Sequence, residues 1–303
     1  MSLPDPRTTC AVQPIDVIIN ADDLGLHPAV RRAVEELASA GALTSASMLA
    51  NGLDQDALRP YPGLSLGAHL NILRGTPISP AREVASLVGA DGLFLGSVRA
   101  LAWRAMRGQL VPAQVRLEWS RQVAHLRARG IAVSHLDGEK HTHLLPGLFE
   151  IACDVAREHG IAWVRRSDER WGAPVVGAGS VRRVVLRALA ARAHTGPMIR
   201  TTDAVWGIAH QGHRFTAAAF ARAVEGRSYA RGPRRVVEVI CHPGREMPGD
   251  PALPAAFGRM RVHSLWEPEF RSLSSGAWTA AAAANNWRLT SFDRLLQNPS
   301  DDR

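Results

Sequence analysis

One pattern repeats along most of this chain: a short run of β-branched and apolar residues, followed by a stretch with apolar residues at helical spacing. The runs predict buried strands, and the stretches between them predict amphipathic helices. The predicted strands cover residues 16–20, 43–49, 64–70, 131–137, 161–165, 235–241 and 288–292. The predicted helices cover residues 28–41, 112–130, 146–159, 179–194, 214–225 and 267–287. Such alternation is typical of a parallel sheet, either in a barrel or in a doubly wound layer.

The number of strands, about seven, favours an α/β fold with one domain, an irregular (β/α) barrel of parallel strands. We expect this barrel to span residues 15–296, after a disordered or extended tail at 1–14 and before a tail at 297–303. Residues 75–111 are rich in Gly and Pro and predict an excursion with short helices. In such barrels the reactive groups lie at the carboxyl ends of the strands, so polar residues that follow a strand are candidates for a site.

Composition and charge narrow the functional classes. The chain has 36 Lys and Arg against 28 Asp and Glu, and only one of these basic residues, Lys140, is a lysine. Because the arginines are spread over many predicted helices without interleaved aromatic residues, we expect no nucleic-acid partner. No apolar run approaches the length of a membrane span, so we expect no integral membrane segment.

The cellular setting follows from the cysteines and the N-terminus. Three scattered cysteines do not suggest a disulfide framework, and the first residues lack a basic segment followed by an apolar one. Both features predict a reduced, cytoplasmic protein. If the chain oligomerises, a homodimer is the expected assembly, since symmetric dimers are the commonest oligomers.

Two adjacent carboxylates, Asp22 and Asp23, follow the first predicted strand. Neighbouring side chains on an extended chain face different ways, so one carboxylate can hold a metal ion while the other acts as a base. The alternative is that they cap the helix that begins at Pro28.

Single histidines mark the ends of two other predicted strands. His69 lies within an apolar run that ends at Asn71, where a histidine is either a metal ligand or a core residue bonded to the backbone. His242 is followed by Pro and Gly, and its alternative is a tight turn. The neighbouring Cys241 is predicted to be an inert apolar residue rather than a nucleophile.

The segment His-Leu-Asp-Gly-Glu-Lys-His-Thr-His at 135–143 contains the strongest indication of a metal site. His141 and His143 are two residues apart, so an extended chain places both on one side. Asp137 and Glu139 add oxygen ligands beside them. A surface loop with a chance pair of histidines is the alternative.

Four ordered motifs resemble the YdjC-like (ChbG-type) carbohydrate deacetylases, a family that includes members from hopanoid biosynthesis. The motifs are IINADDLGLHPAVRRAVEELASAGALTSASMLANG, LGAHLNILRGTP, HLDGEKHTHLLPGLF and VEVICHPG. The resemblance covers roughly residues 15–295. It implies an irregular β/α barrel, one divalent metal ion (magnesium or zinc), and removal of an acetyl group from an N-acetylated sugar or glycoconjugate.

The resemblance also implies roles for individual residues. Asp23 and His69 correspond to metal ligands, Asp22 to the catalytic base, and His242 to the general acid or a stabiliser of the transition state. Three more residues are expected to contact substrate, namely Asn71, His143 and Arg165. Arg165 could instead orient Asp22.

One position departs from the family's pattern. The third metal ligand is usually a histidine two residues after an Asp-Ser or Asp-Gly step, and in this chain Glu139 stands there. We expect Glu139 to bind the ion through its carboxylate, which shifts the preference toward magnesium or manganese. The alternatives are that His141 moves in as the ligand, or that metal binding is weak and the activity altered.

The expected reaction is therefore metal-assisted amide hydrolysis by a carbohydrate N-deacetylase. Two alternatives stay open. One is another metal hydrolase on the same barrel, such as a phosphoesterase, which would place phosphate-binding arginines around the metal. The other is a non-catalytic carbohydrate-binding relative.

Overall fold

The computed structural model describes residues 14–171, 178–225, 235–257 and 265–297, so nearly all of the two predicted tails lies outside the described residues. The strands are β1 (Ile15–Leu24), β2 (Ser45–Met48), β3 (Ser65–Leu70), β4 (Val133–Gly138), β5 (Trp163–Val164), β6 (Ala204–Trp206), β7 (Arg235–Cys241) and β8 (Trp287–Leu289). The α-helices are α1 (Pro28–Ser39), α2 (Val98–Met106), α3 (Pro112–Ala128), α4 (Leu148–Glu158), α5 (Ala178–Ala190), α6 (Ala217–Val224), α7 (Trp266–Ser274), α8 (Ala277–Ala284) and α9 (Phe292–Gln297). Short 3-10 turns lie at Gln55–Ala57, Ala81–Glu83, Glu139–Leu144, Gly212–Arg214 and Ala255–Phe257.

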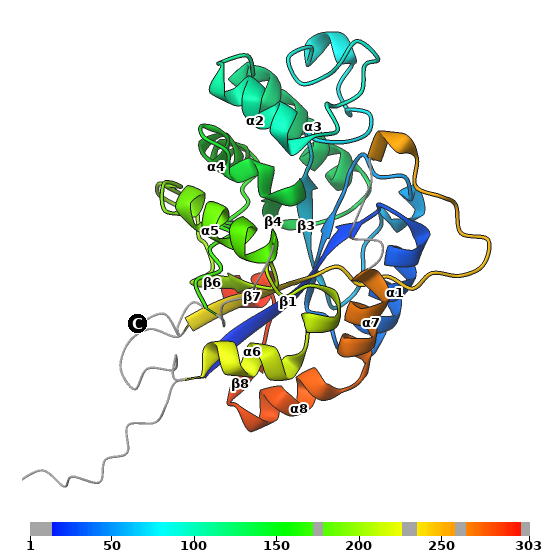
Figure 1. Ribbon diagram of the computed structural model, residues 1–303, viewed down its shortest axis with the longest axis vertical. Helices are drawn as coiled ribbons and strands as arrows, with labels where there is room; N and C mark the ends of the chain where they lie inside the picture. The colour runs from blue at the N-terminus through cyan, green and yellow to red at the C-terminus, as the bar shows by residue number, and fades with distance from the viewer. Residues whose placement is uncertain (1–13, 172–177, 226–234, 258–264, 298–303) are drawn as a thin grey trace, which may run out of the picture.

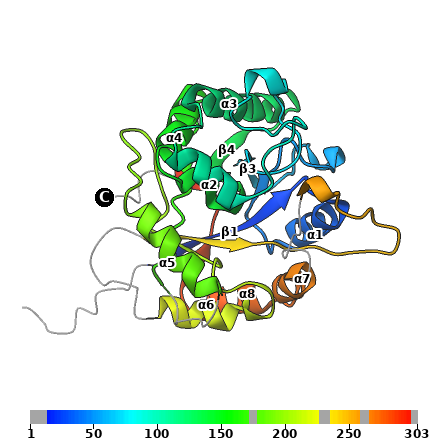
Figure 2. The ribbon, with the colours of Figure 1, turned by 45° about the horizontal axis from the view of Figure 1, so that its top comes forward.

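All strand pairs are parallel, and the sheet has the order β5-β4-β3-β2-β1-β7-β6. β8 pairs with the first residues of β1, Ile15 to Val17. β2 pairs with the same edge of β1 closer to its carboxyl end, from Asn20 onward. The sheet curls, and helices lie around its outer face (Figure 1, Figure 2). Among the described residues, β5 and β6 at the two ends of the sheet do not pair, although Trp163 forms a single bridge to Arg200. The predicted single-domain irregular barrel of parallel strands is confirmed.

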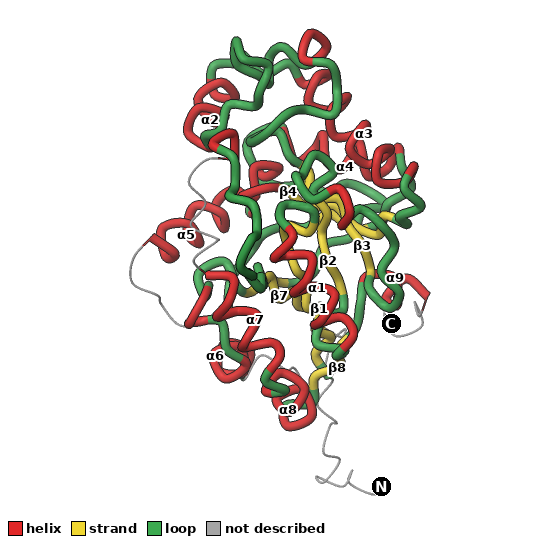
Figure 3. The backbone as a smooth tube through the Cα atoms, turned by 90° about the vertical axis from the view of Figure 1, so that its right-hand side faces the viewer, coloured by secondary structure: helices red, strands yellow, loops and turns green. Residues whose placement is uncertain are grey.

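The strands form because their side chains are buried on both faces. All ten residues of β1 are buried, between the barrel interior on one side and the helices on the other. Such two-sided burial explains why the strand reads as a continuous apolar run. α1 packs on β1 and presents apolar residues at helical spacing, and it starts at a proline preceded by His27, whose side chain accepts from the Ala29 N–H. Figure 3 shows the strands enclosed by helices in this way.

Each of the seven predicted strands corresponds to a strand of the structure, and β6 is an addition. Three residues do not make a recognisable period, which is why β6 escaped the sequence analysis. The single helix predicted over 267–287 is wrong, because the chain turns at Gly276, with φ 74°, and α7 and α8 are separate. The strand predicted over 288–292 is shorter, since α9 begins at Phe292.

None of the helices in the described ranges combines the length and the apolar character that crossing a membrane requires.

Phe292, the first residue of α9, stacks its ring on His135 of β4 with 4.0 Å between the ring centroids. Both ring nitrogens of His135 lie near hydroxyl groups, Nδ1 at 2.8 Å from Ser134 Oγ and Nε2 at 3.2 Å from Ser47 Oγ. Burial lowers the pKa of His135 to about 3. The imidazole is therefore neutral in the folded protein and forms part of the floor beneath the polar end of the barrel.

A depressed histidine pKa makes stability depend on pH in a defined direction. In the unfolded chain His135 takes up a proton below about pH 6.5, whereas the folded protein resists this until about pH 3. Stability from this group is thus complete above the unfolded pKa and falls as the pH decreases. We expect His135→Gln to lower the slope of unfolding free energy against pH, between these limits, by about 1.4 kcal/mol per pH unit. Urea titrations of both proteins at several pH values measure this, and parallel slopes would contradict it.

Gly207, directly after β6, lies against β7 with φ 115°, and a Cβ there would be 2.2 Å from the Ile240 carbonyl oxygen. Gly249 also has a positive φ, 93°, but a Cβ there would meet nothing within 4 Å. We expect Gly249→Ala to cost about 1–2 kcal/mol of unfolding free energy from backbone strain alone. Gly207→Ala should cost clearly more, because the strand end must also shift. Equal losses in urea unfolding would show that the β6–β7 contact is not tight.

Candidate active site and metal centre

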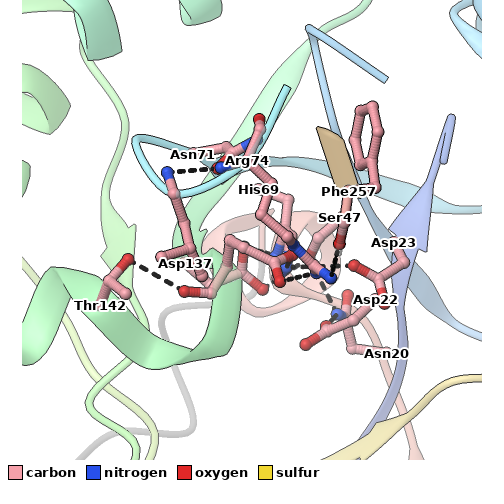
Figure 4. Close-up of polar contacts among 12 residues, drawn as sticks. Asn20, Asp22, Asp23, Ser47, His69, Asn71, Arg74, Asp137, Thr142 and Phe257 are labelled. Atoms are coloured by element: carbon pink, nitrogen blue, oxygen red, sulfur yellow. Dashed lines mark hydrogen bonds and ion pairs between the residues drawn. The ribbon is translucent and has the colours of Figure 1, made fainter. Parts of the chain in front are cut away.

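Asp22 and Asp23 lie near the carboxyl end of β1, where its pairing with β2 changes register. Asp23 has φ 67°, a left-handed conformation that is uncommon for residues other than glycine. The two buried carboxylates consequently meet different partners, since Asp22 binds Arg165. Asp23 faces His69 (Figure 4). The left-handed backbone at Asp23 thus directs the two neighbouring carboxylates toward different partners.

Three residues from β1, β3 and the turn after β4 converge at this end of the barrel. His69 Nε2 lies 3.6 Å from Asp23 Oδ1 and 3.4 Å from Glu139 Oε2. One ligand atom from each of the three lies within 4.8 Å of the other two, and all three residues are buried. The predicted ligands Asp23, His69 and Glu139 are therefore brought together.

Asp137 of β4 holds the ring of His69 in place. His69 Nδ1 donates to Asp137 Oδ1 at 2.8 Å, which leaves Nε2 toward Asp23 and Glu139. A carboxylate on the far nitrogen is the usual support of a metal-binding histidine. Burial opposes ionisation of Asp137, but Arg165 and His69 hold its pKa well below the ordinary range. Asp137 is thus a permanent anion behind the candidate ligand.

The buried guanidinium of Arg165 joins three strands. It donates to both oxygens of Asp22 at 2.8 Å, to Glu238 Oε1 at 2.9 and 2.7 Å, and lies 2.7 Å from Asp137 Oδ2. Asn20 Nδ2 also donates to Asp22 Oδ1 at 2.8 Å. Such a two-pronged arginine contact fixes the plane of the Asp22 carboxylate.

The charges of this region leave an excess of negative groups. Two buried guanidiniums, Arg74 and Arg165, face five buried carboxylates. These are Asp22, Asp23, Asp137, Glu139 and Glu238. Burial and the charge of Glu139 raise the pKa of Asp23 to about 8. Asp23 Oδ1 is also buried without a hydrogen-bond partner among the described residues.

These observations fit a divalent cation held by Asp23, His69 and Glu139. The cation would satisfy the unpartnered oxygen and offset the excess charge, and two carboxylates with one imidazole suit magnesium, manganese or zinc. Asp22, His69 and Asp137 form a second group within the same distance. In that group Arg165 and His69 already occupy the carboxylate oxygens, so the first group is the better site.

Arg74 was not anticipated from the sequence. Its guanidinium pairs with Glu139 Oε1 and donates to the Phe257 carbonyl at 3.0 Å. Burial disfavours the charge on Glu139, but Arg74 and His69 lower its pKa below the ordinary value. Asn71 shapes the turn that carries Arg74: its Oδ1 accepts from two backbone N–H groups, and its Nδ2 donates to the Arg74 carbonyl at 2.9 Å.

The two histidines after Glu139 occupy different places. His141 has φ 59°, its Nδ1 lies 2.9 Å from Ser167 Oγ, and it joins neither ligand group among the described residues. His143 is completely buried and donates to the Arg165 carbonyl at 2.8 Å. Gly138 is needed beside it, because a Cβ there would be 2.5 Å from His143 Nδ1. His143 therefore supports the segment that carries Arg165.

His242 follows β7. Its backbone N–H donates to Glu269 Oε2 at 2.6 Å, and its Nδ1 lies 3.8 Å from the same oxygen. The ring nitrogen Nδ1 has no hydrogen-bond partner among the described residues. An imidazole placed next to a carboxylate, with a nitrogen still free, can transfer a proton.

A cavity of about 560 Å³ opens over these groups. Its floor is polar, and its walls carry apolar side chains from α2 and α5. The lining residues are Asp22, Asp23, His69, Val98, Glu139, Lys140, His141, Thr142, Leu145, Arg182, Val185, Leu186, Leu189, Gln211, His242 and Leu265. Asn71, His143 and Arg165 are not among them. Trp206 is fully buried in an aromatic cluster with Phe215 and Phe220, so its ring does not face the pocket.

The sequence analysis missed Arg74, Glu238 and Glu269. Glu238 gave a signal that could have been used, because it is a single acid inside the apolar run Val-Val-Glu-Val-Ile. Arg74 gave none, since it follows a strand in a segment with ordinary turn residues. Only its contact with Glu139 reveals it.

Known proteins resemble this chain over most of its length. The family model described as YdjC-like protein matches residues 16–284. A carbohydrate deacetylase of Homo sapiens is 31% identical over 304 residues, which cover 92% of this chain and 90% of the relative. A carbohydrate deacetylase of Mus musculus is 31% identical over 309 residues, which cover 93% of this chain and 95% of the relative.

A solved structure shares the fold. The crystal structure of an Enterococcus faecalis protein, whose name refers to cellobiose-phosphate cleavage, aligns with a TM-score of 0.66 and 20% sequence identity. The alignment covers 93% of this chain and 99% of that one. With the family model matched over most of its length, this chain belongs to the YdjC-like protein family.

Proposed function

We propose that this protein is a carbohydrate deacetylase that hydrolyses the acetamide group of an N-acetylated sugar or glycoconjugate. The names of the human and mouse relatives support the reaction class. The observation that carries the proposal is the juxtaposition, on one pocket floor, of a candidate metal-binding group and a carboxylate fixed by arginine. Amide hydrolysis needs both an electrophilic centre and a base.

Asp23, His69 and Glu139 would hold one divalent ion, magnesium or zinc. When bound there, the ion supplies a Lewis acid for the amide carbonyl and the charge that offsets the developing oxyanion. Arg74 neutralises one oxygen of Glu139, so the set presents less negative charge than its two carboxylates suggest.

Asp22 is the base that accepts the proton of the attacking water. Arg165 holds both of its oxygens from behind, and Asn20 holds one of them. Asp22 still lines the pocket, and its Oδ2, which accepts only from Arg165, keeps a lone pair for a proton. A base with a fixed plane loses little orientational freedom when it reacts.

His242 is the acid that protonates the departing sugar amine. It lines the same pocket from β7, while Glu269 anchors its backbone and faces its ring. An imidazole suits this role because its ring nitrogens can both carry and release a proton.

Asn71, His143 and Arg165 act as positioning residues rather than as direct substrate contacts. Each is buried, and each uses its polar atoms on protein groups behind the pocket. The finer expectations of a cytoplasmic location and a homodimer accompany this proposal as predictions.

Asp22→Asn tests the assignment of the base. The amide matches the carboxylate in shape but accepts no proton, so we expect acetate release from N-acetylated oligosaccharides to fall about a hundred- to ten-thousand-fold. Acetate assay and mass spectrometry of the sugar, which detects loss of one acetyl group, provide the measurement. Divalent-ion binding should stay near wild type, whereas the unfolding temperature should fall, because Arg165 loses one of its three charged partners. Activity retained in this variant, or phosphate release in place of acetate, would contradict the proposal.

Glu139→Gln and His141→Gln, as a matched pair, test which residue completes the metal site. Glu139 lies 3.4 Å from His69, whereas His141 bonds Ser167. We expect Glu139→Gln to weaken binding of manganese at least about tenfold, and His141→Gln to leave it unchanged. Calorimetric titration of protein freed of metal by a chelator measures both. The reverse order of effects would assign the third ligand to His141.

A further inference from the structure

Two helices beside the pocket expose apolar side chains instead of polar ones. On α5, Val181 and Val184 are each 65% exposed and Val185 is 51% exposed. On α2, Met106 is 71% exposed and Trp103 is 53% exposed. Large apolar side chains gathered on one surface of a soluble protein mark an interaction site more often than isolated ones do.

The spacing on α5 shows that this exposure is organised. Val181, Val184 and Val185 are three and four residues apart and share one face of the helix. Leu186 and Ala190 are buried and lie on the opposite face. α5 is thus anchored by one apolar stripe and presents a second one to solvent.

The same two helices are basic and contain no acidic residue. Arginines flank the apolar side chains, Arg99 and Arg107 at α2 and Arg182 and Arg187 on α5. Arg187 also lies 3.7 Å from Asp168. The guanidinium of Arg107 lies 4.2 Å from the Trp103 ring centroid. An apolar face bordered by arginine and tryptophan has the composition of a helix that lies in a lipid interface.

Both helices also border the mouth of the pocket. Val98 of α2 and Val185, Leu186 and Leu189 of α5 line its wall. Val185 belongs to both surfaces, so the exposed stripe continues into the cavity.

We propose that α2 and α5 form a docking surface for an anionic lipid bilayer, with the pocket mouth held at the membrane. The positive charge of α2 and α5 favours a bilayer over a second copy of the chain as the partner of this surface. A symmetric dimer through this surface would set arginines against arginines without an acid on either helix. Anionic lipid headgroups complement the same arginines, while the valines, Trp103 and Met106 enter the interface.

Vesicle co-sedimentation tests the proposal directly and requires no turnover, so its result is independent of the deacetylase assignment. We expect the protein to bind vesicles of phosphatidylcholine with about one third phosphatidylglycerol, and to bind pure phosphatidylcholine much less. Added salt should weaken the binding, because it screens exposed charges.

Val184→Asp and Met106→Asp, one on each helix, should each lower the partition coefficient about tenfold or more, since a carboxylate replaces an apolar contact in an anionic interface. Neither residue lines the pocket, so acetate release from a soluble substrate should be unchanged. Leu296→Asp is the control, because α9 packs at the start of β3, at the opposite end of the barrel. Circular dichroism verifies the folding of all three variants.

Three results would overturn the proposal. The first is a folded wild-type protein that binds neither kind of vesicle. The second is binding that Val184→Asp and Met106→Asp leave unchanged. The third is a dimer, seen by analytical ultracentrifugation, that Val184→Asp dissociates while vesicle binding is absent.

Discussion

The buried guanidinium of Arg165 is the contact on which the polar end of this barrel depends. It binds carboxylates from three different strands, Asp22 of β1, Asp137 of β4 and Glu238 of β7. A buried charge without partners is very costly, and removing one partner of such a pair typically costs about 3–5 kcal/mol. The same contact that stabilises the barrel interior therefore fixes the orientation of the proposed base.

A second consequence follows from the number of carboxylates. Arg165 binds three of them and Arg74 binds Glu139, whereas Asp23 binds neither arginine. Asp23 Oδ1, like Glu238 Oε2, has no hydrogen-bond partner in the described part of the chain. Burial without a partner is unfavourable for an anion. The point where Asp23, His69 and Glu139 meet therefore favours a positive charge, and a divalent ion would suit it in charge and in ligand chemistry.

The glutamate at 139 gives the candidate site its own balance of charge. Glu139 is accompanied by Arg74, which is held in turn by the Phe257 carbonyl. The Asn71 turn positions that arginine. The carboxylate and its partner cation therefore come from segments far apart in sequence.

Parts of this picture were accessible from sequence because they depend on local patterns. Periodicity predicted the parallel strands, and acids and histidines at their ends indicated Asp22, Asp23, His69 and Glu139. Local patterns failed where a contact between distant segments decides the outcome, as for β6, which is a strand only because β7 lies beside it. The turn at Gly276 was visible as a glycine, but the alanine-rich stretch after it favoured a continuous helix.

The sequence by itself determined the class of fold, the end of the barrel at which the candidate site lies and the types of ligand available there. These properties follow from the order of apolar and polar residues along each strand, and that order acts within a few residues. Only the tertiary structure decided that Glu139 and not His141 approaches His69, that Arg165 serves Asp22, and that α2 and α5 leave apolar faces in solvent. Each of those outcomes depends on where a second segment lies, and hydrophobic periodicity carries no information about that.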